Sequence, residues 1–83
     1  MYFCYILFSK SKNRFYVGHT SDLDDRLARH NEGRSSATKH GVPWELVYTE
    51  KFESRAEAMA RESEIKSWKS SKRIRELLGE RPV

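Results

Sequence analysis

Five side chains in this chain have the chemistry of a reaction site as much as that of a protein core. They are two tyrosines, an arginine, a histidine and a glutamate: Tyr5, Tyr16, Arg26, His30 and Glu62. Phenol and imidazole groups exchange protons, a guanidinium binds two oxygens of an anion at once, and a carboxylate binds a cation. Such groups could act on a charged substrate if the fold brings them together.

Taken one at a time, each of these residues also has a simpler structural role. Tyr5 and Tyr16 suit core aromatics whose hydroxyls lie at the boundary with water. Arg26 and His30 are four residues apart and could form an exposed pair on one face of a helix. Glu62 lies four residues before a lysine, which is the spacing of an ion pair on a helix surface. Spacing alone therefore leaves their role open.

Several well-characterised reaction motifs are missing from the sequence. It has no glycine-rich phosphate loop, no cysteine–histidine zinc spacing, and no serine or cysteine nucleophile with a partner. Charged residues make up 34% of the 83 residues and hydrophobic residues 37%, which predicts one small domain over residues 1–83 with a thin core. Such a core is not expected to enclose a large organic cofactor.

The N-terminal run and the cysteine content indicate a cellular compartment. Cys4 is the only cysteine, so no internal disulfide can form. The apolar run from Met1 to Phe8 is far shorter than the roughly 20 residues of a membrane-spanning helix, and it lacks the features of a signal peptide. We interpret this run as a buried strand and expect a cytoplasmic protein.

Three strands are expected. Residues Tyr2–Phe8 and Arg14–Gly18 are rich in aromatic and branched side chains, and the polar stretch Ser9–Asn13 between them suits a turn. The two strands should form an antiparallel hairpin with Tyr5 and Tyr16 on one face. The third strand is expected over residues 44–52.

The first helix is expected directly after the hairpin. Ser21 is the predicted N-cap, with Asp24 three residues later, where an acidic side chain favours the helix start. Leu23 and Leu27 follow at helical spacing. Gly33 can adopt the left-handed conformation that ends a helix.

Two further helices follow the third strand. Ser54 and Glu57 form a capping box that opens a helix running to about Trp68. One face of this helix carries small or flexible side chains: Ala56, Met59, Ala60 and Ser63. Ser70 or Ser71 caps a last helix that ends at a glycine. The fold class is therefore α/β of the α+β type, a three-stranded antiparallel sheet flanked by three helices in the order β-β-α-β-α-α.

Basic residues cluster near the C-terminus of the chain. The formal net charge is +4, and the segment 66–75 holds five basic residues and no acidic one. A basic stripe of this kind is typical of proteins that bind a phosphate backbone, although a merely solvated face would have the same composition. The charge therefore favours a nucleic-acid partner without deciding for it.

Taken in chain order, the residues resemble the GIY-YIG nuclease superfamily, and in particular its small stand-alone bacterial members. The first family triplet appears as Phe3-Cys4-Tyr5 and the second as Tyr16-Val17-Gly18. Arg26, His30 and the pair Arg61-Glu62 follow at family-like spacings over nearly the whole chain.

The resemblance implies a metal-dependent endonuclease that hydrolyses phosphodiester bonds, in DNA more readily than in RNA, with a role in repair or recombination. It implies that Tyr5 and Tyr16 flank the attacking water, one of them acting as general base or positioning that water. Arg26 would stabilise charge on the scissile phosphate, and His30 would assist proton transfer or orient the phosphate. Glu62 would hold one Mg²⁺ or Mn²⁺, because such an ion needs few protein ligands beside water and substrate.

Further roles follow from the same resemblance. Gly18 would be structural and let the backbone pass close to the site. A free tyrosine, with a pKa of about 10, is a poor base, so the charge of Arg26 or of the metal would have to lower that pKa. The nucleic acid would be bound by four basic residues: Lys66, Lys69, Lys72 and Arg73. A protein partner could supply specificity.

The sequence departs from the family pattern in two places. Phe3 stands where the first triplet has glycine, and residues 70–73 contain no asparagine, although many members carry one there. The alternative is therefore a catalytically weak or inactive nucleic-acid-binding module of the same fold, with Trp68 available to stack on bases. A third hypothesis is a protein-interaction domain, which an exposed apolar patch and scattered site residues would favour.

Overall fold

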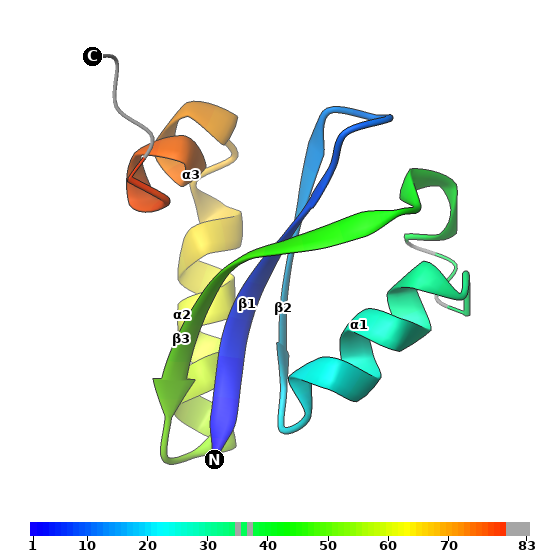
Figure 1. Ribbon diagram of the computed structural model, residues 1–83. Helices are drawn as coiled ribbons and strands as arrows, with labels where there is room; N and C mark the ends of the chain where they lie inside the picture. The colour runs from blue at the N-terminus through cyan, green and yellow to red at the C-terminus, as the bar shows by residue number, and fades with distance from the viewer. Residues whose placement is uncertain (35, 37, 80–83) are drawn as a thin grey trace.

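The computed structural model describes residues 1–34, 36 and 38–79 of the chain. Its strands are β1 (Tyr2–Ser9), β2 (Arg14–Thr20) and β3 (Trp44–Phe52). Its α-helices are α1 (Leu23–Asn31), α2 (Arg55–Ser67) and α3 (Ser71–Leu77), and the short 3₁₀ helix Lys39–Gly41 precedes β3 (Figure 1). The predicted order of strands and α-helices and the α+β fold class are confirmed.

The sheet is antiparallel throughout, with strand order β2-β1-β3. Because β1 is central, most of its side chains are buried, whereas β2 is an edge strand. Tyr5 pairs with Gly18 and Leu7 with Tyr16, and residues directly opposite each other in a sheet share a face. Tyr5 and Tyr16 therefore share a face as predicted, with ring centroids 6.4 Å apart.

The two faces of the sheet carry separate clusters of buried side chains. On one face Cys4, Ile6 and Val17 pack with Ile65 of α2. On the other face Tyr5, Leu7 and Trp44 form a second cluster, against which leucines of α1 pack. The helices α1 and α2 thus cover opposite faces, and β2 lies at the edge between them (Figure 1).

The helix boundaries agree with the predicted ones except at the start of α1. Its N-cap is Asp22, not Ser21, and the Asp22 carboxylate accepts a hydrogen bond from the amide of Asp25 at 3.0 Å. The hydroxyl of Thr20 bonds the backbone on both sides of Asp22, so the strand continues further than predicted and the helix starts one residue later. The Ser54–Glu57 capping box is present as predicted, and Ser70 caps α3.

The helix α2 packs on the sheet through a different face from the one with small residues. Met59 is 47% exposed, and Ala56, Ala60 and Ser63 are exposed as well. The buried positions are Ala58 and Ile65, one stripe of the helix. Glu62 lies four residues after Ala58 and therefore belongs to the face that packs against the sheet.

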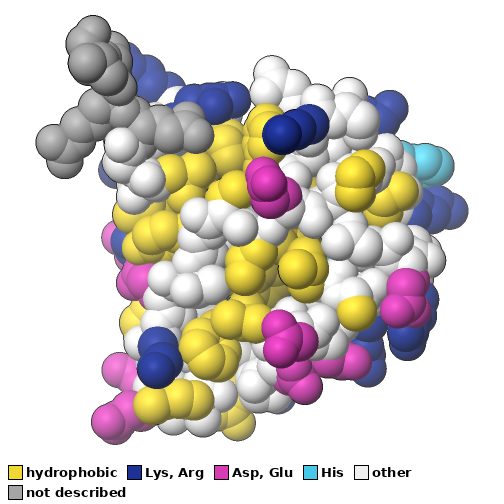
Figure 2. All heavy atoms as spheres, in the orientation of Figure 1, with side chains coloured by type: hydrophobic (Ala, Val, Ile, Leu, Met, Phe, Trp, Pro, Cys, Tyr) yellow, Lys and Arg dark blue, Asp and Glu magenta, His cyan; other side chains and the backbone are white. Residues whose placement is uncertain are grey.

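The surface of the described residues shows little that would favour a protein-interaction domain. Among them, the large hydrophobic side chains that are exposed are Met1, Val42 and Met59, which lie on separate elements. Figure 2 shows Lys and Arg side chains along the side of the molecule that α1 and the following loop form. Within the described part of the chain, no helix has the length and apolarity to cross a bilayer.

The packing of α2 leads to a first prediction. Ile65→Ala should lower the free energy of unfolding by about 2–5 kcal/mol, because it leaves a cavity between α2 and the sheet. Met59→Ala removes a comparable side chain from the same helix but from its exposed side, and should cost less than about 1 kcal/mol. Urea unfolding of both variants measures the difference. Equal losses would contradict the assignment of the packed face.

Candidate active site

Tyr5 extends across β2 over a glycine. Its side chain is 2% exposed, and a Cβ atom on Gly18 would lie 2.6 Å from the Tyr5 hydroxyl oxygen. Real Cβ atoms essentially never come so close to another heavy atom. Gly18 is therefore required for the phenol to reach past the edge of the sheet.

The hydroxyl of Tyr5 ends at a buried histidine. It lies 3.0 Å from Nε2 of His30, and Nδ1 of His30 lies 2.7 Å from the hydroxyl of Thr38. His30 is 2% exposed and Thr38 is 1% exposed. A neutral imidazole has one donor and one acceptor nitrogen, so these two hydroxyls satisfy it completely. Sequence reasoning missed Thr38.

Burial keeps Tyr5 and His30 uncharged. Burial, and then the positive charge of Arg26, lower the pKa of His30, so its imidazole is neutral at neutral pH. Burial, and then Tyr16, raise the pKa of Tyr5, and Arg26 opposes this only in part. Arg26 does act to lower the pKa of Tyr5, but desolvation of the phenolate is the larger effect, and the pKa is raised overall.

Arg26 lies in a basic pocket next to this pair. Five residues line the pocket, which has a volume of about 380 Å³: Tyr16, Arg26, Arg29, His30 and Arg34. Arg29 pairs with Asp25 at 3.1 Å, and Arg34 pairs with Glu32. Arg26 has no ion-pair partner among the described residues, and its buried Nε has no hydrogen-bond partner there either. An unpaired buried N–H costs about 1–3 kcal/mol, so an anion in this pocket would be favoured.

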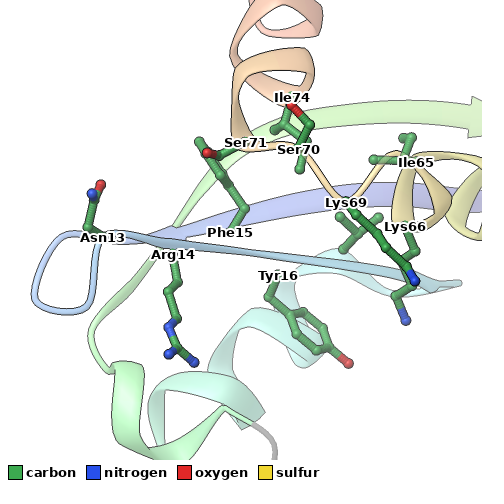
Figure 3. A pocket seen from close by; sticks show the side chains of 11 residues that line it. Asn13, Arg14, Phe15, Tyr16, Ile65, Lys66, Lys69, Ser70, Ser71 and Ile74 are labelled. Carbon is green, nitrogen blue, oxygen red and sulfur yellow. The ribbon is translucent and has the colours of Figure 1, made fainter.

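Tyr16 lies where three pockets meet. Its ring centroid is 4.9 Å from that of His30, and its hydroxyl has no hydrogen-bond partner within the described part of the chain. Besides the Arg26 pocket, it lines a pocket of about 320 Å³ with Lys12 and His40 and one of about 460 Å³ with Lys69. In Figure 3 Arg14 and Tyr16 leave β2 on the same side, with the hydroxyl of Tyr16 directed away from the strand.

Glu62 approaches this edge from α2, on the other side of the sheet. Its side chain is 17% exposed; Oε1 accepts a hydrogen bond from Nδ1 of His19 at 2.6 Å, and Oε2 accepts one from Nζ of Lys66 at 2.5 Å. Burial acts to raise the pKa of Glu62, but Lys66 and His19 outweigh it and hold that pKa below its usual value. The negative charge of Glu62 also adds to the raised pKa of Tyr5, so the two groups lie within electrostatic reach.

The donor groups at this edge fit one weakly held divalent cation. Among the described residues no group of three or more His, Cys, Asp or Glu side chains could enclose an ion. Mg²⁺ needs no such enclosure, since it keeps several waters and is usually bound by one or two carboxylates and by substrate phosphates. The ionised, partly exposed carboxylate of Glu62 meets that requirement, provided that Lys66 or His19 gives way.

The basic residues at the end of α2 and after it lie in different surroundings. Lys69, Ser70 and Ser71 line the pocket of Figure 3, and Lys69 turns the chain there with a φ of 49°. Lys66 reaches back around the sheet edge and lies 5.8 Å from the ring centroid of Tyr16. Lys72 is exposed.

Trp68 is not free to stack on bases, which corrects the expectation from the sequence. Its ring packs against the cluster around Ile65, and the guanidinium carbons of Arg61 and Arg73 lie 5.7 and 4.6 Å from its centroid. Both guanidinium groups therefore lie within cation–π distance of the ring. Arg73 is exposed but held by this contact.

The geometry is that of a compact polar site at the edge of a small sheet, and comparison with known proteins shows the family to which the chain belongs. Residues 1–75 match the GIY-YIG catalytic domain, and the chain belongs to this family. The chain is similar to the UPF0213 protein SH2523 of Staphylococcus haemolyticus, with 40% identity over 73 residues, 86% of this chain and 89% of the relative. It is also similar to the UPF0213 protein NP_0776A of Natronomonas pharaonis, with 39% identity over 75 residues, 89% of this chain and 87% of the relative.

A solved structure has a similar fold. The solution structure of the UPF0213 protein BH0048 from Bacillus halodurans has a TM-score of 0.60 and 34% sequence identity, and the match covers 95% of this chain and 84% of the other. The family resemblance inferred from the sequence is thereby confirmed. GIY-YIG proteins are nucleases that generally depend on a divalent metal, so the family membership implies a nucleic-acid substrate.

The buried histidine generates a prediction about pH. Because the pKa of His30 in the folded protein lies below the usual 6.5, the unfolded chain takes up the proton first as the pH falls. The stabilising contribution of neutral His30 should therefore be complete above about pH 6.5 and be lost below it, towards the lowered pKa. Urea unfolding between about pH 5 and pH 7.5 measures this slope.

Two histidine variants supply the control. His30→Gln should lose this part of the slope, whereas His40→Gln, at an exposed position, should retain it. A slope that survives in His30→Gln would show that other groups cause it.

Proposed function

We propose that the protein is a divalent-metal-dependent endonuclease that hydrolyses phosphodiester bonds in nucleic acid, with DNA as the preferred substrate. The single observation that carries this proposal is the environment of Arg26. Its guanidinium has no acidic partner among the described residues and lies beside Tyr16 and His30 in a basic pocket. A phosphodiester would supply the missing acceptor oxygens, and a planar guanidinium suits two of them.

The two tyrosines take different roles in this proposal. Tyr16 contacts the attacking water, because its hydroxyl faces the pockets and has no hydrogen-bond partner within the described residues. Tyr5 keeps its proton, since burial raises its pKa, and it holds His30 in place. Because both nitrogens of His30 are bonded to the hydroxyls of Tyr5 and Thr38, His30 acts in this proposal by orienting Tyr5 and the helix turn that carries Arg26. Arg26 stabilises the negative charge that grows on the phosphate oxygens.

Glu62 is the proposed cation ligand. A Mg²⁺ or Mn²⁺ ion bound there would act as a Lewis acid and stabilise the leaving oxygen. The carboxylate is ionised at neutral pH because Lys66 and His19 hold its pKa low.

The three pockets around Tyr16 support a path for the substrate strand. Basic residues line each of them: Arg26, Arg29 and Arg34 in one, Arg14, Lys66 and Lys69 in the second, Lys12, Arg14 and His40 in the third. Phosphates on either side of the cleaved bond would occupy neighbouring pockets. Lys72 and Arg73 extend this surface by their charge.

The proposal extends to the cellular role. We infer a cytoplasmic enzyme that acts in DNA repair or recombination. A site on an open sheet edge has little room to read bases, so a protein partner would supply specificity.

A cleavage assay tests the proposed function. The wild-type protein should cut at least one member of a panel of linear, nicked, flapped and branched DNA and RNA, with Mg²⁺ or Mn²⁺. Glu62→Gln should abolish cleavage, and Tyr16→Phe should lower the rate by about 10²–10⁴-fold, as loss of acid–base assistance does. Initial rates on labelled substrates measure both effects.

The matched control is Glu64→Gln, which removes the same charge from an exposed site on α2, where the residue pairs with Arg61. It should cut like the wild type. If the wild-type protein cuts no substrate with either ion but still binds nucleic acid, the chain is the inactive binding module and the enzyme proposal fails.

The substrate path generates a separate prediction about binding. In the Glu62→Gln background, Arg14→Gln and Lys69→Gln should each lower the slope of log affinity against log salt by about 1, because each removes one phosphate contact. Lys51→Gln removes the same charge from exposed β3, at the opposite edge of the sheet, and should leave the slope unchanged. Fluorescence anisotropy of labelled DNA measures the slopes. If all three variants change the salt slope equally, a localised path for the substrate strand is contradicted.

A further inference from the structure

His19 contacts Glu62 and, in the mechanism proposed above, only helps to keep that carboxylate ionised. It directly follows Gly18 in β2, so its side chain points to the opposite face from Gly18 and Tyr5, towards α2. Its Nδ1 lies 2.6 Å from Oε1 of Glu62, and its side chain is 29% exposed at the edge strand. The imidazole and the carboxylate thus lie side by side where water and ions have access.

The two atoms are almost at the separation of neighbouring ligands on one ion. Ligands at right angles in an octahedral shell, each about 2.1 Å from the ion, lie about 3 Å apart. The pair would therefore need to open by only a few tenths of an ångström. In the metal-free protein Nδ1 donates its proton to the hydrogen bond with Oε1, so Nδ1 ligates only after the imidazole has changed to the tautomer that carries its proton on Nε2.

The position of Lys66 is compatible with this arrangement. Its Nζ bonds the other carboxylate oxygen, Oε2, and its side chain is 49% exposed. It can therefore leave Oε1 free to ligate, or swing into solvent. The remaining coordination positions would face the edge of the sheet, where water and phosphate oxygens can enter.

An imidazole ligand changes which ion the site prefers. Carboxylate and water oxygens suit both Mg²⁺ and Mn²⁺, whereas the affinity for an imidazole nitrogen rises along the Irving–Williams order of transition metals, which begins with Mn²⁺. A carboxylate site with one histidine should therefore discriminate against Mg²⁺.

We propose that His19 is a second protein ligand beside Glu62, and that the site binds Mn²⁺ or a related transition-metal ion in preference to Mg²⁺. This inference rests on the proposed role of Glu62 as the cation ligand. It assigns a direct ligand role to a residue that otherwise only holds the carboxylate by a hydrogen bond.

The test is metal binding without nucleic acid, by calorimetry with Mn²⁺ and Mg²⁺ and by pulsed electron paramagnetic resonance of bound Mn²⁺. The wild-type protein should bind Mn²⁺ about 10-fold or more tightly than Mg²⁺ and show the coupling of one directly bound imidazole nitrogen. His19→Asn keeps a donor that can reach Oε1 but has no imidazole. It should lose the nitrogen coupling and most of the preference for Mn²⁺, while its Mg²⁺ affinity changes less than about 3-fold.

His40→Asn is the matched control, since it removes a histidine from a different pocket, and it should retain the nitrogen coupling. The proposal is overturned if bound Mn²⁺ shows no imidazole coupling, if His19→Asn keeps the preference, or if the wild-type protein binds no Mn²⁺. If His19→Asn still cuts DNA with Mg²⁺ in the first two cases, the nuclease proposal stands and only the ligand role of His19 fails. If the coupling is present but no substrate is cut, the metal site stands without the nuclease function.

Discussion

The hydrogen bond between Tyr5 and His30 is the interaction on which the arrangement of the site depends. Both side chains are 2% exposed, and leaving either polar group unpaired would cost about 1–3 kcal/mol. The bond ties the central strand to α1, and the contact from His30 to Thr38 ties α1 to the segment beyond it. Because Arg26 lies one turn before His30, the same bond fixes the helix turn from which the Arg26 side chain extends. Gly18 makes the bond possible, since any larger residue would block the phenol.

The location at an edge strand explains how groups from both faces of the sheet take part. The two faces hold separate buried clusters, so side chains on α1 and α2 cannot meet through the sheet. They can meet around β2, where Lys66 of α2 lies 5.8 Å from the ring of Tyr16 on the α1 face. The position at the edge strand also separates the neutral groups of the site from its charged groups, because the two sets differ in burial. The neutral pair lies inside, and Arg26, Lys66 and Glu62 lie where water and substrate can reach them.

The sequence predicts the fold better than it predicts the contacts of the site. Periodicity and caps are local signals, so the strand over residues 44–52 and the Ser54–Glu57 box could be predicted. The contact of His19 with Glu62 joins residues 43 apart, and it depends on which helix passes that edge of the sheet. Alternation with Gly18 does place His19 on the other face, which is the one signal that could have indicated this contact. The burial of Trp68 by two arginines likewise depends on the angle between α2 and α3.

The site also shares its residues with the core, which limits how far chemistry and stability can be separated. Tyr5, His30 and Thr38 are among the largest fully buried side chains, so a thin core is in part made of the site itself. Replacing Tyr5 or His30 therefore changes stability together with proton chemistry. Tyr16, Arg26 and Glu62 are only half-buried and lie outside the most buried part of the core, so their charge or hydroxyl can be removed at smaller structural cost. The unpaired, buried Nε of Arg26 opposes folding, and a phosphate held in the pocket that Arg26 lines would stabilise the protein by binding the folded state.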